Sequence, residues 1–217
     1  MKKFEFTGET KTLLDGTVLH RIKALVHIKF GCMAVEIGEL GGWIEKENNL
    51  SHDGNAWVCG NAEVYGNAWV CGNARVYEDA KVYGNAWVCG NAEVYGNARV
   101  CDDARVYGNA RVYDEARVCR NAEVYGNARV CGDAEVFRME HYLVIGPIGS
   151  RNAFTTFFRT KERNIKVVCG CFFGTIDEFL AKVEQTHGDS KHAKVYRAAV
   201  EVALAQLEDV ERRNGNG

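Results

Sequence analysis

A strict six-residue repeat occupies the middle of the chain and constrains its fold more than any other feature. Valine recurs at every sixth position from Val58 to Val136, an alanine stands two residues before each valine, and no insertion interrupts the fourteen units. An amphipathic helix would repeat its apolar residues about every 3.6 positions, so a period of six excludes a helix here. The residues on either side of the block, 1–53 and 138–217, lack the repeat.

Most units have the pattern Ala-x-Val-x-Gly-Asn, which predicts a short strand followed by a tight corner. Alanine and valine are two residues apart, so their side chains point to the same side of an extended segment. Glycine and asparagine adopt left-handed backbone angles at little cost, and the chain has 23 glycines against one proline. Identical strands joined by identical corners must coil, with valine over valine and backbone groups paired between coils at a spacing of about 4.8 Å.

The outward charges indicate how many strands make one coil. Three strands per coil would stack residues 18 apart, and at this separation five neighbouring pairs have opposite charge against three of like charge. At a separation of 12 the two kinds are equal. Stacked opposite charges stabilise neighbouring strands, so the pattern favours three-sided coils, about four to five in number. The opposite pairs are Glu63/Lys81, Arg75/Glu93, Glu93/Arg111, Arg105/Glu123 and Arg117/Glu135.

A resemblance to a known family follows from the repeat. Units of a small residue, any residue and an aliphatic residue at a period of six resemble the hexapeptide-repeat superfamily over residues 54–137. The resemblance implies a left-handed parallel β-helix of triangular section, commonly a homotrimer. One departure is that Tyr or Cys follows the aliphatic residue, where that family often has glycine or a small residue. The sequence motif GNAxVY, with the flanking segments LGGWIEKENNLSHDG and IGPIGSRN, also resembles the sequences of hexapeptide-repeat proteins encoded by phages and prophages.

Three parts are predicted along the chain, and together they make a mainly β fold. A β-strand cap at 1–53 precedes the hexapeptide-repeat β-helix at 54–137, and a small α+β module follows at 138–217. The cap would cover the unpaired backbone groups of the first coil, which could otherwise recruit other chains. Its predicted strands are residues 4–12, 17–25 and 33–40.

The third part is predicted to be three strands followed by two helices. The strands are residues 142–146, 154–160 and 165–173. Thr175 and Glu178 form a capping box, so a helix should begin near Ile176 and end at Gly188. A second helix is predicted over 190–212, with an apolar face of Tyr196, Val200, Ala203, Leu207 and Val210.

Charge and hydropathy exclude some classes of function. The formal net charge is −2, which does not indicate nucleic-acid binding. No apolar run reaches 18 residues, so no membrane span is expected, and the start MKKFEFTGETKTLLDG lacks the apolar core of a signal peptide. We therefore expect the protein to stay in the cytosol of the cell that makes it, and the resemblance to phage-encoded proteins implies that this cell is a bacterial host.

Nine cysteines are present, an odd number, and no pair of CxxC motifs occurs. A cytosolic location favours reduced thiols that pack as small apolar residues. Stacked cysteines could bind a soft metal, but one stacked pair supplies two ligands where structural zinc takes four. We therefore predict no metal and no cofactor.

The segment IGPIGSRN, residues 145–152, is the candidate ligand-binding element. Its glycines, the Ser150 hydroxyl and the Arg151 guanidinium suit a phosphate or carboxylate group, and Arg159 could join them from the neighbouring strand. The spacing matches neither a Walker loop nor the dinucleotide fingerprint. The alternative interpretation is a hairpin turn with a surface arginine.

Aromatic and arginine side chains stacked on the coil faces are the candidate interaction surface. Two interpretations remain open: the columns stabilise the sheets, or they form a recognition surface, because Tyr, Trp and Arg dominate protein interfaces. The residues are Trp69, Trp87, Tyr77, Tyr95, Tyr113, Arg75 and Arg111.

Catalysis is weakly indicated. Many proteins of the superfamily are acyltransferases that use a histidine on a coil, but no histidine lies between residues 54 and 137, and His52 and His141 only flank the block. Cys171 and His187 bracket a helix about 18 Å long, so we expect them not to meet. No catalytic residue is predicted.

The sequence therefore favours a non-enzymatic binding or interaction protein. Its resemblance to phage-encoded proteins suggests action on a host component, such as inhibition of a bacterial defence system or capture of a signalling nucleotide. The expected partners are other copies of the chain, with a trimer common in this superfamily, and a host protein or a small phosphorylated ligand. The alternatives are an acyltransferase acting at a subunit cleft and a structural protein that polymerises through its coil ends.

Overall fold

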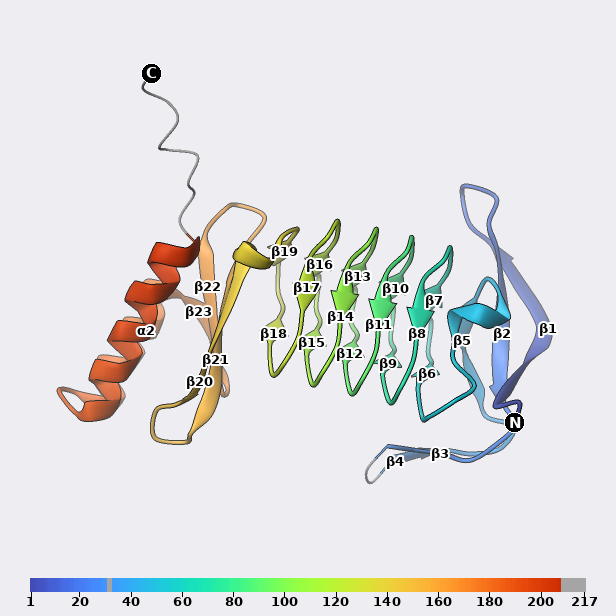
Figure 1. The fold of residues 1–217 in the computed structure, drawn as a ribbon, viewed down its shortest axis with the longest axis horizontal. Helices are drawn as coiled ribbons and strands as arrows, with labels where there is room; N and C mark the ends of the chain where they lie inside the picture. Colours follow the sequence, from blue (N-terminus) through green and yellow to red (C-terminus); the bar gives the residue numbers. More distant parts are fainter. Residues whose placement is uncertain (31–32, 208–217) are drawn as a thin grey trace, which may run out of the picture. The chain divides into compact units, whose positions relative to one another are not determined.

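The computed structural model describes residues 1–30 and 33–207, in two compact units (Figure 1). The first unit is Met1–Met139 and holds the N-terminal strands together with the whole repeat. The second is Glu140–Gly217, of which the structure describes the part up to Leu207. Among the described residues, no helix is both long and apolar enough to cross a membrane.

Two-residue strands, β6 to β19, form the coils of the first unit (Figure 1). Each ends at a repeat valine and pairs in parallel with the strand 18 residues away, so that Val82 lies beside Val64 and Val100. The predicted coil of three strands is confirmed. The strands are β6 (Trp57–Val58), β7 (Glu63–Val64), β8 (Trp69–Val70), β9 (Arg75–Val76), β10 (Lys81–Val82), β11 (Trp87–Val88), β12 (Glu93–Val94), β13 (Arg99–Val100), β14 (Arg105–Val106), β15 (Arg111–Val112), β16 (Arg117–Val118), β17 (Glu123–Val124), β18 (Arg129–Val130) and β19 (Glu135–Val136).

The alanines and valines of the repeat fill the interior of the coils. Every one, from Ala56 to Val136, exposes at most 1% of its surface. Burying one valine side chain stabilises a fold by about 1.5–3 kcal/mol, so the stacked valines form a continuous core along the unit. Neighbouring coils add backbone hydrogen bonds, such as that from the Tyr95 N–H to the Val112 carbonyl at 3.0 Å.

Each corner passes through one residue in the left-handed backbone region. This position recurs every six residues from Gly54 to Gly132, with φ between 58° and 74°, and ten of the fourteen residues are glycine. The others are Glu78, Asp102, Asp114 and Arg120. The three acids accept hydrogen bonds from the backbone N–H of the corner residue 18 positions later, at 2.8, 3.0 and 3.1 Å, which offsets their strain.

Outward side chains stack along the coils with the same spacing of 18 residues. All five predicted opposite-charge pairs are ion pairs. The asparagines after the corner glycines form ladders, in which Asn73 donates to Asn91 and Asn91 donates to Asn109, both at 3.0 Å. Such ladders satisfy polar groups that would otherwise lie unpaired along the corners.

Strands β1 (Phe4–Thr12), β2 (Val18–Ala24) and β5 (Leu40–Ile44) extend one face of the solenoid. The sheet has eight strands in the order β1-β2-β5-β7-β10-β13-β16-β19, with β5 parallel to β7. The ammonium of Lys3 donates to the Ala56 carbonyl at 2.8 Å, and burial, partly offset by Asp53, lowers its pKa to about 8. Asn49, in the short helix η1 (Glu47–Asn49), donates to the Ala68 carbonyl at 2.8 Å. The predicted cap is therefore confirmed.

The second unit is a four-stranded antiparallel sheet with two helices. The sheet consists of β20 (Tyr142–Ile148), β21 (Ala153–Arg159), β22 (Ile165–Cys169) and β23 (Phe172–Thr175), after the short helix η2 (Met139–His141). Helix α1 (Ile176–His187) has the predicted capping box and ends at Gly188. Helix α2 (Lys191–Leu207) buries the predicted face as far as Leu207, whereas Val210 lies outside the described residues.

Two predicted strands are each divided by a turn in the structure. Residues 165–173 form β22 and β23 rather than one strand, because Gly170 has φ of 62° and reverses the chain. Residues 33–40 include β4 (Met33–Val35), which pairs with β3 (Ile28–Phe30), and only the start of β5. Gly38, with φ of 87°, separates β4 from β5.

Candidate functional site

A cavity of about 190 Å³ in the second unit gathers basic, hydroxyl and thiol groups from four places in the fold. The turn between β20 and β21 contributes Ser150 and Arg151, and the turn between β22 and β23 contributes Cys171. Helix α1 contributes Lys182, and α2 contributes Tyr196. The apolar part of the lining includes Phe172, Phe179 and Val183.

The turn that contains Ser150 and Arg151 packs directly on Tyr196. A Cβ at Gly149 would lie 1.8 Å from the hydroxyl oxygen of Tyr196, and Gly149 has φ of 73°, so this position requires glycine. Tyr196 is itself 7% exposed, on the buried face of α2. The packing of a rigid aromatic ring therefore fixes the turn beside the cavity.

The Tyr196 hydroxyl lies in a partly polar surrounding behind the turn. Thr155 Oγ1 donates to Cys169 Sγ at 3.3 Å, and the Cys169 thiol lies 3.9 Å from the Tyr196 hydroxyl. Burial and the neighbouring Cys169 raise the pKa of Tyr196 to about 12, and the positive charge of Arg151 opposes this shift. A neutral hydroxyl and the cations of Arg151 and Lys182 together favour an anionic group in the cavity.

The structure brings together two of the three ligand residues expected from the sequence. Ser150 and Arg151 line the cavity, but Arg159 is not among its lining residues. The Nε of Arg159 instead donates to the carbonyl of Leu207 at 2.7 Å, at the end of α2. A guanidinium there stabilises the negative end of the helix dipole, so the structure gives Arg159 a structural position.

Sequence reasoning missed the cavity residues that the two helices supply. The expectation that Cys171 and His187 do not meet stays a prediction, although both residues line the cavity. Strand β23 leads from Cys171 to the start of α1, and α1 packs against β22 and β23, so its far end returns toward Cys171. Lys182 and Tyr196 have no local sequence signal for the cavity, because they reach it only through the packing of α1 and α2.

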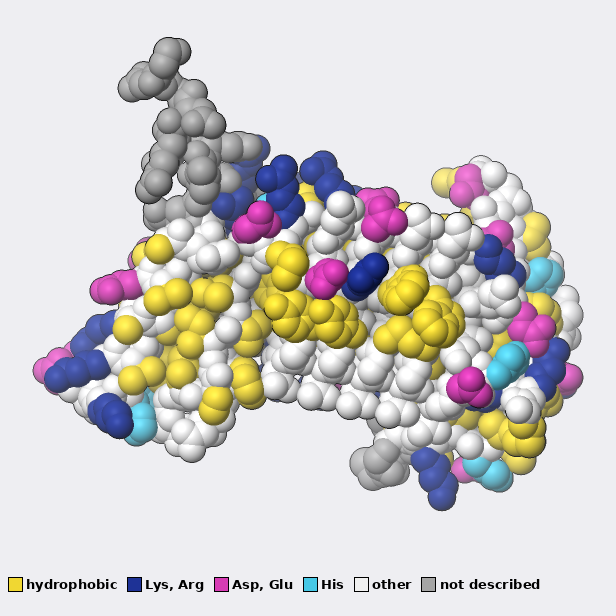
Figure 2. Space-filling model, viewed as in Figure 1, with side chains coloured by type: hydrophobic (Ala, Val, Ile, Leu, Met, Phe, Trp, Pro, Cys, Tyr) yellow, Lys and Arg dark blue, Asp and Glu magenta, His cyan; other side chains and the backbone are white. Residues whose placement is uncertain are grey.

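A second hollow, of about 630 Å³, lies in the first unit beside two exposed tryptophans. Trp69 and Trp87 expose 37% and 45% of their surface, and their rings meet edge to face at 5.5 Å. In Figure 2, groups of hydrophobic side chains lie over the coils on this face. The hollow also includes His52, whose Nδ1 accepts the Lys3 backbone N–H at 3.0 Å while its Nε2 lies 2.8 Å from Glu47. Both ring nitrogens of His52 are therefore engaged.

The other predicted surface residues contact one another. The rings of Tyr77, Tyr95 and Tyr113 stack with centroids 4.8 and 5.0 Å apart. Arg75 and Arg111 both pair with Glu93, a side chain that is 14% exposed. Burial, followed by the charge of Glu93, raises the pKa of Tyr77 to about 12. These contacts stabilise neighbouring coils and leave part of each ring accessible.

Four cysteines form disulfides between coils, contrary to the expectation of reduced thiols. Cys71 bonds to Cys89 and Cys101 bonds to Cys119, each 18 residues apart. Stacking places their Cα atoms 4.7 and 4.6 Å apart, within the usual range for a disulfide. The expectation relied on the cellular compartment and considered the stacked cysteines only as metal ligands, whereas stacking also brings them within disulfide distance. Cys32 lies outside the described residues.

Comparison with known proteins bears on the repeat region. Residues 104–120 match a family model described as the YdcK beta solenoid repeat. The repeat region is a β-solenoid. The match spans less than one 18-residue coil, so it supports this fold and does not assign the whole chain to a family. A search of the curated proteins finds no match.

Proposed function

We propose that this chain is a non-enzymatic binding protein whose C-terminal unit captures a phosphate or carboxylate group. The observation that supports it is the cavity that Arg151 and Lys182 line together with Ser150 and Tyr196. Guanidinium and ammonium groups make charge-assisted hydrogen bonds to such anions, and hydroxyls add directional donors.

The size of the cavity limits what it encloses. Small-molecule sites commonly measure about 300–1,000 Å³, whereas this cavity measures about 190 Å³. It therefore suits one phosphoryl or carboxylate group, and the rest of a larger ligand would remain outside. A terminal phosphate of a nucleotide fits this description, which agrees with capture of a phosphorylated signalling molecule.

The biological setting is part of the same proposal. The GNAxVY motif of the repeat resembles that of phage- and prophage-encoded hexapeptide-repeat proteins, and this resemblance supports a protein that acts on a bacterial host component, for example in counteracting a defence system. The exposed Trp69 and Trp87 offer the solenoid a surface for a host protein or another copy of the chain.

The two alternatives have less support. An acyltransferase needs a histidine whose ring nitrogen can take a proton, and both nitrogens of His52 are engaged with Lys3 and Glu47. A polymer formed through coil ends needs open coil edges, and at the N-terminal end the coil strand β7 is already paired with β5.

Calorimetric titration of the full chain tests the proposal. We expect inorganic phosphate and adenosine monophosphate to bind the wild type, and Arg151→Ala or Lys182→Ala to weaken binding at least about tenfold, which is about 1.4 kcal/mol. Lys161→Ala removes an exposed lysine of the same unit that is not among the lining residues, and should bind as the wild type does. Equal affinity of the wild type and Arg151→Ala, or no binding of either ligand, would overturn the proposal.

A further inference from the structure

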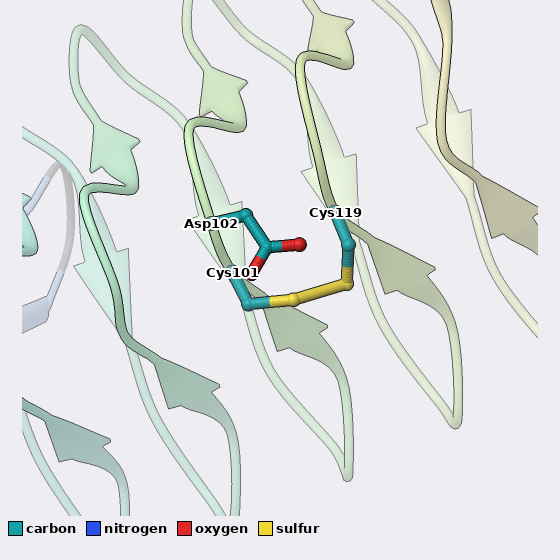
Figure 3. A group of neighbouring side chains, drawn as sticks. All are labelled: Cys101, Asp102 and Cys119. Atoms are coloured by element: carbon teal, nitrogen blue, oxygen red, sulfur yellow. A yellow bond between two sulfur atoms is a disulfide. The ribbon is translucent and has the colours of Figure 1, made fainter.

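Cys101, Asp102 and Cys119 bring two sulfur atoms and a carboxylate together on neighbouring coils (Figure 3). Their possible ligand atoms all lie within 4.8 Å of one another. The two cysteines are joined as a disulfide and are each 5% exposed, whereas Asp102 is exposed. Figure 3 shows the Asp102 carboxylate beside the sulfur atoms and directed toward Cys119. Among the described residues, these three form the group of His, Cys, Asp or Glu side chains that lie close enough together to hold one metal ion.

We propose that reduction of the Cys101–Cys119 disulfide creates a binding site for a thiophilic divalent cation such as Zn²⁺. A small-molecule phosphine supplies the two electrons: the phosphine takes the oxygen of one water to become the phosphine oxide, and the protein gains two cysteine thiols. Binding one cation then releases the two cysteine protons, because thiolates are the ligands. Thiolate ligands select zinc and related soft cations, and Asp oxygen is an accepted zinc ligand.

The spacing of the three groups suits one cation. A zinc–sulfur distance of about 2.3 Å places two sulfur ligands of a tetrahedral ion roughly 3.8 Å apart. All three ligand atoms lie within 4.8 Å of one another, so after reduction the two sulfur atoms would move apart to this separation while the carboxylate stays close to both. Three protein ligands leave the fourth position to water, on the side where Asp102 is exposed.

The backbone holds the ligands in place without the disulfide. The N–H of Cys101 donates to the Val118 carbonyl at 3.0 Å, and the N–H of Cys119 donates to the Val136 carbonyl at 3.1 Å. Asp102 Oδ2 accepts the Arg120 N–H at 3.0 Å, which orients the carboxylate and does not involve Oδ1. Such outer hydrogen bonds position ligands before the metal arrives.

The second disulfide supplies a natural comparison within the chain. Cys71 and Cys89 stack in the same way, with Cα atoms 4.7 Å apart, but Gly72 and Gly90 follow them. After reduction this pair offers two thiolates and no carboxylate from the corner. A stacked cysteine pair alone supplies only two ligands for a metal. Asp102 at the corner adds a third ligand to Cys101 and Cys119, and the Cys71–Cys89 pair has no equivalent acid.

Titration of the full chain with Co²⁺, a spectroscopic substitute for Zn²⁺, tests the inference. Protein reduced with a phosphine under argon should bind one Co²⁺ at this site, with a sulfur-to-cobalt charge-transfer band that Zn²⁺ abolishes. The disulfide-bonded protein should show no such band. Asp102→Gly restores the residue found at most corners, so the fold should persist while affinity falls at least about tenfold. Gly72→Asp should create a second site.

Paired cysteine variants complete the test. Cys101→Ser with Cys119→Ser should abolish the band, and Cys71→Ser with Cys89→Ser should retain it. Wild-type affinity in Asp102→Gly, no band in the reduced wild type, or loss of the band only with Cys71 and Cys89 would each overturn the inference. None of these variants alters the cavity of the second unit, so the result is independent of the proposed anion binding.

Discussion

Replacing corner glycines with alanine should destabilise the solenoid, and the loss should depend on whether the backbone of the next coil lies close to the added Cβ. Gly90 and Gly126 occupy equivalent corners, with φ of 71° and 68°, so alanine in the left-handed region costs about 1–2 kcal/mol at either. A Cβ at Gly90 would approach the backbone N and O of Gly108 at 3.0 and 3.1 Å, whereas one at Gly126 would meet nothing within 4 Å. Overpacking adds about 1–3 kcal/mol. We therefore expect Gly90→Ala to lose about 2–5 kcal/mol and Gly126→Ala about 1–2 kcal/mol.

Aspartate at the same position should be less harmful than alanine. Gly90→Asp adds the same Cβ, but its carboxylate can accept the N–H of Gly108, as Asp102 accepts that of Arg120 at 3.0 Å. A hydrogen bond to a charged group contributes about 1.5–3 kcal/mol, and exposure at the corner reduces this. Gly90→Asp should therefore be more stable than Gly90→Ala by about 1 kcal/mol.

Urea unfolding followed by tryptophan fluorescence measures these differences. The four tryptophans, Trp43, Trp57, Trp69 and Trp87, all lie in the first unit, so the signal does not depend on the second. The midpoints should shift while the slopes stay constant, which is the signature of a change in stability alone. Equal losses at Gly90 and Gly126, or a lower stability for aspartate than for alanine at Gly90, would refute the reasoning.

Three further predictions concern other contacts. Cys71→Ser should lower the stability of the oxidised protein by about 3 kcal/mol, because the bond to Cys89 closes a loop of 18 residues; a deficit that persists in reductant would contradict this. Burial raises the pKa of Glu63, but hydrogen bonds and charges from two lysines outweigh it and lower the pKa. The ionised Glu63 carboxylate therefore stabilises the fold above the unfolded pKa of about 4.3, and this stabilisation is lost as the pH falls through the folded pKa. Glu63→Gln should flatten the acid side of the curve of stability against pH. Parallel curves for the wild type and the variant would argue against the pairing of Glu63 with the lysines. Gly149→Ala should displace Tyr196 and abolish phosphate binding without changing the tryptophan unfolding curve, and intact binding in calorimetry would disprove the close packing.

The coils could be predicted from the sequence because each six-residue unit repeats the same short-range pattern. Alternation of Ala and Val sets the buried side, and Gly-Asn sets the corner, so no long-range information is needed. The separation of 18 residues between stacked positions was predicted from opposite charges such as Glu63 and Lys81, whose side chains form an ion pair of 2.8 Å in the structure. The capping box at Thr175 is equally local, which explains why the start of α1 was predicted correctly.

The cavity could not be predicted, because its residues come together only through packing of distant elements. Arg151 is in a hairpin turn, Lys182 on α1 and Tyr196 on α2, and nothing local to any of them indicates the others. From the sequence, Arg159 on the neighbouring strand was expected to bind the same ligand as Arg151. The structure instead places Arg159 against the carbonyl of Leu207 on α2, a contact that depends on how this helix packs against β21.

The exceptions to the repeat contain more information about the coil than the repeat itself. Every hexad has the same interior, so alanine and valine alone do not say which hexads stack. Glu78, Asp102 and Asp114 break the glycine rule at a left-handed corner, where a side chain needs a compensating contact. In each case the compensation is the backbone N–H of the corner residue 18 positions further along, which is the corner that stacks on it when three strands make a coil. An acid at a glycine corner therefore depends on the next coil for its stabilisation, and its partner in the structure agrees with the separation of 18 that the outward charge pairs predict.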